Sequence, residues 1–220
     1  MLVRDLINDL VPPLRATDTV GRAVAWMSVF KQSHLPVMGP NGFIGLVRED
    51  DLGRVDDTTT SLQDLQIPFL RVYVNEYQHV FDAVRLCAAH ETTVVPVLDD
   101  PGRYLGLVTS NDIVVAMAKS NSLQDPGGVL VLDVDAEKYT LSEIARIVES
   151  EGAKLLSVNT NPSTEPGKTE VTLRIDRVDL TRIMAGFFRN DYEVKASYHQ
   201  SEFQPDLQAR YDAFMNYLKI

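Results

Sequence analysis

The chain has 220 residues, 45% of them hydrophobic and 24% charged, which is typical of a globular protein with room for two domains. Its formal net charge of −10 argues against nucleic acid or an anionic membrane surface as the main partner. The single cysteine, Cys87, excludes an intramolecular disulfide and a multi-cysteine zinc site.

We therefore expect a cytoplasmic protein that does not act at a membrane. Residues 1–14 carry acids inside their apolar run and have no small-residue cleavage site, so we expect no signal peptide. Nowhere do about 18 apolar residues follow one another, as a membrane-spanning helix requires.

The first part of the chain predicts a helix followed by two short strands and a short helix. Pro12 and Pro13 stop any earlier helix, and Thr17 or Asp18 can cap a helix that runs to about Gln32. The turn at residues 39–42 separates the two strands, and Asp50 or Asp51 opens the short helix. The expected strands are 35–38 and 43–47, and a polar connector follows at 56–61.

The next part of the chain repeats this pattern. Gly45 and Gly106 lie 61 residues apart, as do Asp51 and Asp112, and the strand sequences HLPV and VVPV lie 60 apart. A fixed period of this kind indicates an internal duplication. The second set of elements is a strand at 70–74, a helix at 80–90, strands at 93–98 and 104–108, and a helix after Thr109.

Each repeat resembles a CBS motif, so the two together resemble a CBS-domain pair, or Bateman module. The residues that carry the resemblance are the helix openings TDTVGRAVAWM and EYQHVFDAVRL, the two strands containing Pro-Val, and the two turns of the form G-L-V-x-x-x-D. The resemblance covers roughly residues 1–120, with motif 1 at 1–60 and motif 2 at 61–120. It implies an α/β fold and association into a homodimer.

After a linker at 121–127, residues 128–200 show a different order of elements. The pattern predicts strand, helix, strand, strand, helix, strand, which is the ferredoxin-like βαββαβ plan. Leu207, Tyr211, Phe214 and Leu218 then predict an amphipathic C-terminal helix over 204–220. The expected elements of the domain are strands 128–134, 154–159, 169–175 and 192–198, helices from 140 or 141 to 151 and 180–188, and a loop at 159–168.

A βαββαβ domain behind a CBS pair resembles an ACT domain, and the whole chain resembles acetoin-utilisation-B-type proteins. Amino-acid-binding ACT domains carry a proline and a glycine where the first strand meets the first helix. This chain has the sequence DVDAEKY at 133–139 instead. Without the glycine the backbone loses its close approach to a ligand, so we do not expect amino-acid binding there.

The sequence offers no catalytic set, and we expect a protein that is not an enzyme and requires no cofactor. The four histidines lack metal-binding spacing, and no nucleophile elbow, P-loop or dinucleotide fingerprint occurs. Cys87 lies on the apolar face of its predicted helix, as a small buried residue would. We therefore predict no metal site.

Thr109 and Asp112 are the main candidates for binding a ligand. In CBS pairs the matching residues hold the ribose and phosphate of an adenosine ligand, and Ser110 beside them completes the candidate set. The alternative is purely local, because T-x-x-D is itself a capping box that stabilises a helix without any ligand. Both interpretations can hold at once.

The first repeat departs from this pattern because Arg48 stands where the second has Thr109. An arginine has no acceptor oxygen for capping, although it can pair with a phosphate. The site at Asp51 is therefore either degenerate, which we favour, or adapted to a more anionic ligand. By resemblance His34 is a candidate phosphate contact, or else a surface or core histidine, and Val95 and the strand ending at Val74 are candidate adenine contacts.

We thus predict a regulatory protein whose CBS pair binds an adenosine-containing ligand such as AMP, ADP or ATP. Binding would change the ACT-like domain or a protein partner. The alternative is a protein-interaction scaffold whose nucleotide site is vestigial.

Overall fold

The computed structural model describes residues 1–120 and 122–198, which divide into two compact units. Unit 1 spans Met1–Ala118 and unit 2 begins at Lys119. The predicted C-terminal helix at 204–220 lies outside the described residues. Within the described part of the chain, no helix combines the length and apolar character needed to cross a membrane.

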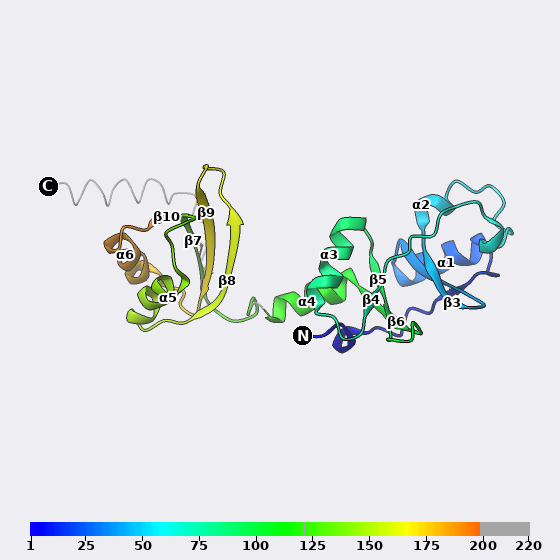
Figure 1. The fold of residues 1–220 in the computed structure, drawn as a ribbon, viewed down its shortest axis with the longest axis horizontal. Helices are drawn as coiled ribbons and strands as arrows, with labels where there is room; N and C mark the ends of the chain where they lie inside the picture. The colour runs from blue at the N-terminus through cyan, green and yellow to red at the C-terminus, as the bar shows by residue number, and fades with distance from the viewer. Residues whose placement is uncertain (121, 199–220) are drawn as a thin grey trace. The chain divides into compact units, whose positions relative to one another are not determined.

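Unit 1 contains two copies of one arrangement (Figure 1). Each copy has a three-stranded sheet whose short first strand runs parallel to the second, and the second and third form an antiparallel hairpin. The first copy contains η1 (Val3–Leu6), β1 (Leu14–Arg15), α1 (Val20–Phe30), β2 (His34–Gly39), β3 (Gly42–Arg48), α2 (Glu49–Leu52) and η2 (Leu62–Asp64). The second contains β4 (Val74–Asn75), α3 (Val80–His90), β5 (Val94–Leu98), β6 (Tyr104–Thr109) and α4 (Ser110–Ser120).

The two copies exchange chain segments. Leu70, just before β4, forms an antiparallel bridge with Leu46 in β3 of the first copy. In the same way Asn8, before β1, forms a bridge with Leu107 in β6 of the second copy. Phe43 and Tyr104, which occupy the same position in the two repeats, stack with ring centroids 6.4 Å apart. These reciprocal contacts are those of two repeats related by an approximate twofold axis.

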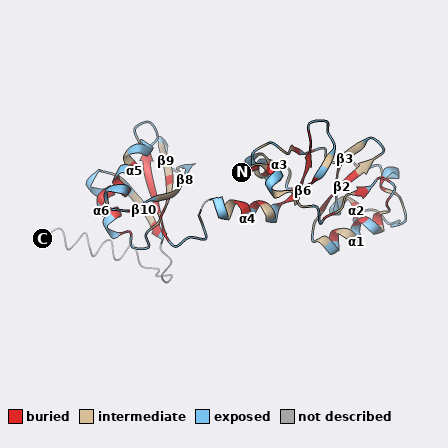
Figure 2. Cartoon of the chain, turned by 90° about the horizontal axis from the view of Figure 1, so that it is seen from below, coloured by how far each residue is buried: buried red, intermediate tan, exposed pale blue. Residues whose placement is uncertain are grey.

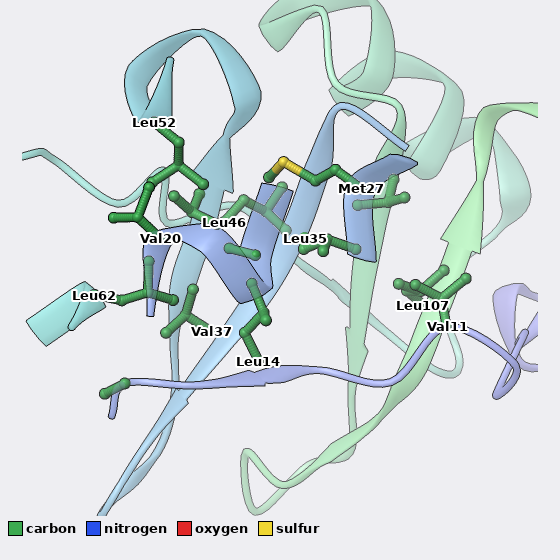
Figure 3. Packing of buried hydrophobic residues seen from close by; sticks show 14 of the residues in the cluster. Val11, Leu14, Val20, Met27, Leu35, Val37, Leu46, Leu52, Leu62 and Leu107 are labelled. Atoms are coloured by element: carbon green, nitrogen blue, oxygen red, sulfur yellow. The ribbon is translucent and has the colours of Figure 1, made fainter. Parts of the chain in front are cut away.

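The cores of unit 1 follow from this exchange. The buried cluster around Leu14, Met27 and Leu35 in the first copy also takes in Leu107 from the second (Figure 3). Conversely, Val3 of the N-terminal segment is buried in the core of the second copy. Neither copy completes its core alone, so the pair folds as one unit.

Several element boundaries in unit 1 differ from the sequence prediction. The predicted strand at 70–74 is shorter, because the backbone of Leu70 pairs with Leu46 and cannot also continue β4 beside β5. The cap of α1 is Thr19, whose hydroxyl accepts the backbone N–H of Arg22, whereas Asp18 accepts the backbone N–H of Arg15. The same helix ends at Phe30 because Lys31 adopts a left-handed conformation.

Unit 2 has the predicted βαββαβ order, and its sheet has the strand order β10-β7-β9-β8 with every neighbouring pair antiparallel. That order is the ferredoxin-like plan. Helices α5 and α6 lie on one face of the sheet and their apolar sides form its core (Figures 1 and 2). The elements are β7 (Gly128–Asp135), α5 (Leu141–Ser150), β8 (Leu155–Pro162), β9 (Lys168–Ile175), α6 (Thr181–Arg189) and β10 (Glu193–Tyr198).

The loop predicted at 159–168 is shorter than expected, because β8 continues to Pro162. Its last residues pair with β9, where Pro162 lies opposite Thr169. Strand β8 is at the edge of the sheet, where a proline without an N–H group is tolerated.

Candidate functional site

Each copy of unit 1 contains a corner at which its third strand turns directly into a helix. We call Arg48–Asp51 the first corner and Thr109–Asp112 the second corner. In each corner, the first backbone N–H of the helix donates to the carbonyl of the residue just before the second strand of the same copy. The Glu49 N–H donates to Ser33 in the first copy and the Ser110 N–H to Thr93 in the second, both at 2.9 Å. The two corners therefore share one backbone geometry and differ in their side chains.

The second corner is held together by Thr109 and Asp112. The Thr109 hydroxyl, which is buried, donates to Asp112 Oδ2 at 2.7 Å and accepts the Asp112 backbone N–H at 3.0 Å. The Thr109 backbone N–H donates to the same Oδ2 at 3.1 Å. This reciprocal pattern is the predicted capping box, and it fixes the carboxylate at the start of α4.

Two polar groups of the second corner remain open within the described residues. Asp112 Oδ1 has no hydrogen-bond partner there, and neither has the backbone N–H of Asn111. Asp112 is half-buried, and the N-terminus of α4, an eleven-residue helix, carries a partial positive charge. The second corner thus places an acceptor for hydroxyl groups beside a donor for an anion.

At the first corner, the side chain of Arg48 forms hydrogen bonds within the protein. Arg48 precedes α2, a helix of only four residues, and makes no side-chain cap. Its Nε donates to His34 Nε2 and its Nη2 to the carbonyl of His90, each at 3.3 Å. Because His90 belongs to the second copy, the guanidinium joins the two copies. Asp51 forms a long ion pair, at 4.0 Å, with the exposed Arg54.

His34 is buried and its ring also joins the two copies. Its Nδ1 lies 3.4 Å from both the hydroxyl and the backbone nitrogen of Thr93. Burial first, and then the charge of Arg48, lower the pKa of His34, although Asp50 and Asp51 oppose the shift. Nε2 faces the Nε–H donor of Arg48 and Nδ1 faces the backbone N–H donor of Thr93, while the Thr93 hydroxyl can donate to Nδ1 or accept from it.

The remaining sequence candidates divide into exposed and buried residues. Ser110 is exposed at the start of α4. Val95 and Val74 are 0% and 1% exposed in the core of the second copy, so neither presents an atom at the second corner. The structure therefore brings together Thr109, Ser110 and Asp112, whereas the two valines are buried in the core of the second copy.

Sequence reasoning missed Asn8, whose side-chain Nδ2 lies 3.4 Å from Asp112 Oδ2. The contact spans 104 positions and arises from the crossing of the N-terminal segment over the second copy. Asn8 is one of four polar residues in the range 1–14, with Arg4, Asp5 and Asp9, so no local signal singled it out.

Other chemistry in the described residues is sparse. No group of histidine, cysteine or acidic side chains there is arranged to hold a metal ion. Burial raises the pKa of the Cys87 thiol, which disfavours the thiolate that a nucleophile needs. A surface hollow of about 450 Å³ lies between Pro12–Pro13 and Trp26, and neither corner lines it.

The second corner lies inside a segment of the chain that matches a known family model. The family model for the CBS domain matches residues 68–119. Inosine-5'-monophosphate dehydrogenase of Methanocaldococcus jannaschii is 24% identical over 152 residues, which are 69% of this chain and 29% of that enzyme. The chain thus spans less than a third of this curated relative.

Two solved structures each match 54% of this chain. A CBS domain pair/ACT domain protein from Thermotoga maritima is 22% identical, with a TM-score of 0.49 over 54% of this chain and 98% of that one. CBSX2 in complex with AMP is 23% identical, with a TM-score of 0.47 over 54% of this chain and 96% of that one.

The matched segment spans β4 to α4, and the first copy repeats the same order of elements with reciprocal crossing contacts. Residues 68–119 are a CBS domain, and together with the first copy they form a CBS-domain pair.

Proposed function

We propose that unit 1 is a regulatory module that binds one adenosine-containing ligand, such as AMP, ADP or ATP, at the second corner. The observation that carries the proposal is the state of the Asp112 carboxylate. Its Oδ2 accepts two hydrogen bonds from Thr109, while its Oδ1 has no partner among residues 1–120 and 122–198. Capping and ligand binding therefore use different oxygens of one side chain.

The chemistry of the second corner suits a ribose phosphate. A carboxylate oxygen has two lone pairs, so Asp112 Oδ1 can accept both hydroxyls of a ribose. A phosphate would lie at the N-terminus of α4, where the Asn111 N–H and the helix dipole favour an anion. The exposed Ser110 hydroxyl is a further donor at the same place.

Only the second corner has this chemistry. At the first corner the arginine already contacts His34 and the His90 carbonyl, and α2 is too short to have a substantial dipole. The degenerate interpretation of the Asp51 site is therefore part of the proposal. Arg48 and His34 act in it as contacts between the copies.

Regulation requires that the ligand prefer one of two arrangements of the protein. Helix α4 begins at the second corner, and its last residues belong to unit 2. A small change in the start of α4 on binding would therefore be carried along the chain into unit 2. We propose this helix as the output of the ligand site.

Thermal shift with AMP, ADP, ATP and S-adenosylmethionine tests the proposal. A ligand at about 100 times its Kd stabilises the folded state by ~2.7 kcal/mol, which raises Tm measurably. The rival interpretation is a scaffold in which the capping box only stabilises α4. The absence of a shift with any of these nucleotides at millimolar concentration would support the scaffold.

Asp112→Asn separates the two roles of this residue. The amide oxygen can still accept from Thr109, but the amide NH₂ group takes the place of the open Oδ1 and cannot accept a hydroxyl proton. We expect the variant to fold and to bind AMP ~10–150-fold more weakly. Asp51→Asn is the matched control and should bind AMP as the wild type does; equal losses would contradict the assignment to the second corner.

A further inference from the structure

Asn8 is fixed beside the second corner by its backbone. The backbone N–H of Asn8 donates to the Leu107 carbonyl at 2.7 Å, and the Leu107 N–H donates to the Asn8 carbonyl at 3.3 Å. Val3, earlier in the same segment, is fully buried in the core of the second copy. The Asn8 side chain is therefore held in place next to Asp112.

The orientation of the Asn8 amide follows from a local hydrogen bond. Its Oδ1 accepts the backbone N–H of Leu10 at 2.9 Å, which directs the NH₂ group toward Asp112 Oδ2 at 3.4 Å. An amide nitrogen carries two N–H donors, and the second one has no partner within the described residues. The second corner thus has an open donor on Asn8 close to the open acceptor on Asp112.

The first corner lacks this donor. The residue that crosses it in the same way is Leu70, which pairs with Leu46 through its backbone with both N···O distances at 2.9 Å. Leucine offers no side-chain hydrogen bond. The donor and acceptor therefore occur together only at the corner where Asp112 is open.

We infer that Asn8 and Asp112 together recognise a ribose hydroxyl of the ligand, so that the second corner selects ribonucleotides over deoxyribonucleotides. A hydroxyl can donate to Asp112 Oδ1 and at the same time accept the free N–H of Asn8. A deoxy sugar would leave both groups unpaired in a half-buried site, which is the situation that gives polar sites their strongest discrimination. This inference rests on the proposed function and adds a specificity-determining residue to it.

The experiment measures the Kd of AMP, 2'-deoxyAMP and 3'-deoxyAMP with the full chain by calorimetry. We expect the wild type to bind AMP ~10–150-fold more tightly than one of the two deoxy compounds, since the lost bond involves a charged acceptor. Asn8→Asp is the informative variant because it has the same shape, keeps an acceptor for the Leu10 N–H and removes both N–H donors. Asn8→Asp should reduce the ratio of the Kd of the deoxy compound to the Kd of AMP by ~2–10-fold.

Asn8→Leu copies the residue of the first corner and is the second variant, and Leu70→Ala is the matched control at the other crossing. Asn8→Leu should narrow the preference in the same way, whereas Leu70→Ala should leave it unchanged. A preference that stays at the wild-type value in both Asn8 variants overturns the inference while leaving the proposed function in place. A wild type that binds none of the three nucleotides overturns both.

Discussion

Replacing Gly106 by alanine tests how closely the N-terminal segment crosses the second copy. Gly106 has a φ of +152°, and a Cβ there would lie 2.6 Å from Ile7 Cγ2 and 3.2 Å from the carbonyl oxygen of Asn8. Neither neighbour is the free end of a flexible side chain. The segment that carries Asn8 would therefore have to move away from β6.

The expected loss of stability in Gly106→Ala has two contributions, and each can be measured alone by an alanine substitution at another glycine. A non-glycine residue at positive φ costs ~1–2 kcal/mol, and overpacking costs a further ~1–3 kcal/mol, so Gly106→Ala should cost ~2–5 kcal/mol. Gly102→Ala has only the first part, because its φ is +87° and nothing lies within 4 Å. Gly45→Ala has only the second, because its Cβ would meet Phe69 Cβ at 2.8 Å.

Urea unfolding followed by the fluorescence of Trp26 measures these losses in unit 1, because Trp26 in α1 is the single tryptophan of the chain. At a constant m value, the shift in midpoint gives the difference in free energy of unfolding. If Gly106→Ala costs no more than Gly102→Ala, the crossing is looser than the structure indicates, and the placement of Asn8 beside Asp112 fails with it.

Three further changes test other contacts. Burial lowers the pKa of His34 from 6.5, so the folded state resists protonation of this ring. The free energy of unfolding of the wild type should therefore be constant above pH 6.5 and fall as the pH decreases below it. His34→Leu should remove this fall, measured as the difference between the urea midpoints at about pH 7.5 and about pH 5.5. Thr109→Val removes the hydroxyl of the capping box and should cost ~0.5–2 kcal/mol by the same Trp26 measurement, with an unchanged free energy of unfolding showing that the cap is dispensable. In unit 2, Asp133 is buried, its Oδ1 has no partner within the part of the chain that the structure describes, and its Oδ2 lies 3.7 Å from Lys168 Nζ. Asp133→Val should therefore leave the Tm from far-UV circular dichroism unchanged or raise it, and a lower Tm would show that Lys168 needs this carboxylate.

Much of the fold could be predicted because it is encoded in local periodicity. The structure has α3 at the predicted bounds, Val80–His90, since its apolar stripe and flanking turn residues all lie within a few positions. Because the sequence is duplicated, the order of elements predicted for one repeat supported the order predicted for the other. In unit 2, strict alternation in β9 predicted the strand to within one residue.

The crossing segments could not be predicted, because their pairing partners are distant in the chain. Leu70 belongs to a run of strand-forming residues, yet it pairs with Leu46 in the other copy instead of extending β4. Nothing within a few residues of Leu70 or Asn8 specifies those partners. Such pairing is decided by tertiary contacts that override local propensity.

The candidate site divides in the same way. The Thr109–Asp112 capping box is a contact between residues three positions apart, so the sequence specifies it directly. The contact of His34 with Arg48 joins two paired residues of the β2–β3 hairpin, whereas the contacts of His34 with Thr93 and of Arg48 with His90 depend on the two copies meeting. The expected phosphate role of His34 came from resemblance, which carries no information on that meeting.

The most direct test of a single ligand site at the second corner is the stoichiometry of AMP binding to the full chain, measured by isothermal titration calorimetry. Wild type and Asp51→Asn should each bind one AMP per chain with the same Kd, and Asp112→Asn should bind AMP ~10–150-fold more weakly. Two AMP molecules per wild-type chain, or a site that survives in Asp112→Asn and disappears in Asp51→Asn, would contradict the account.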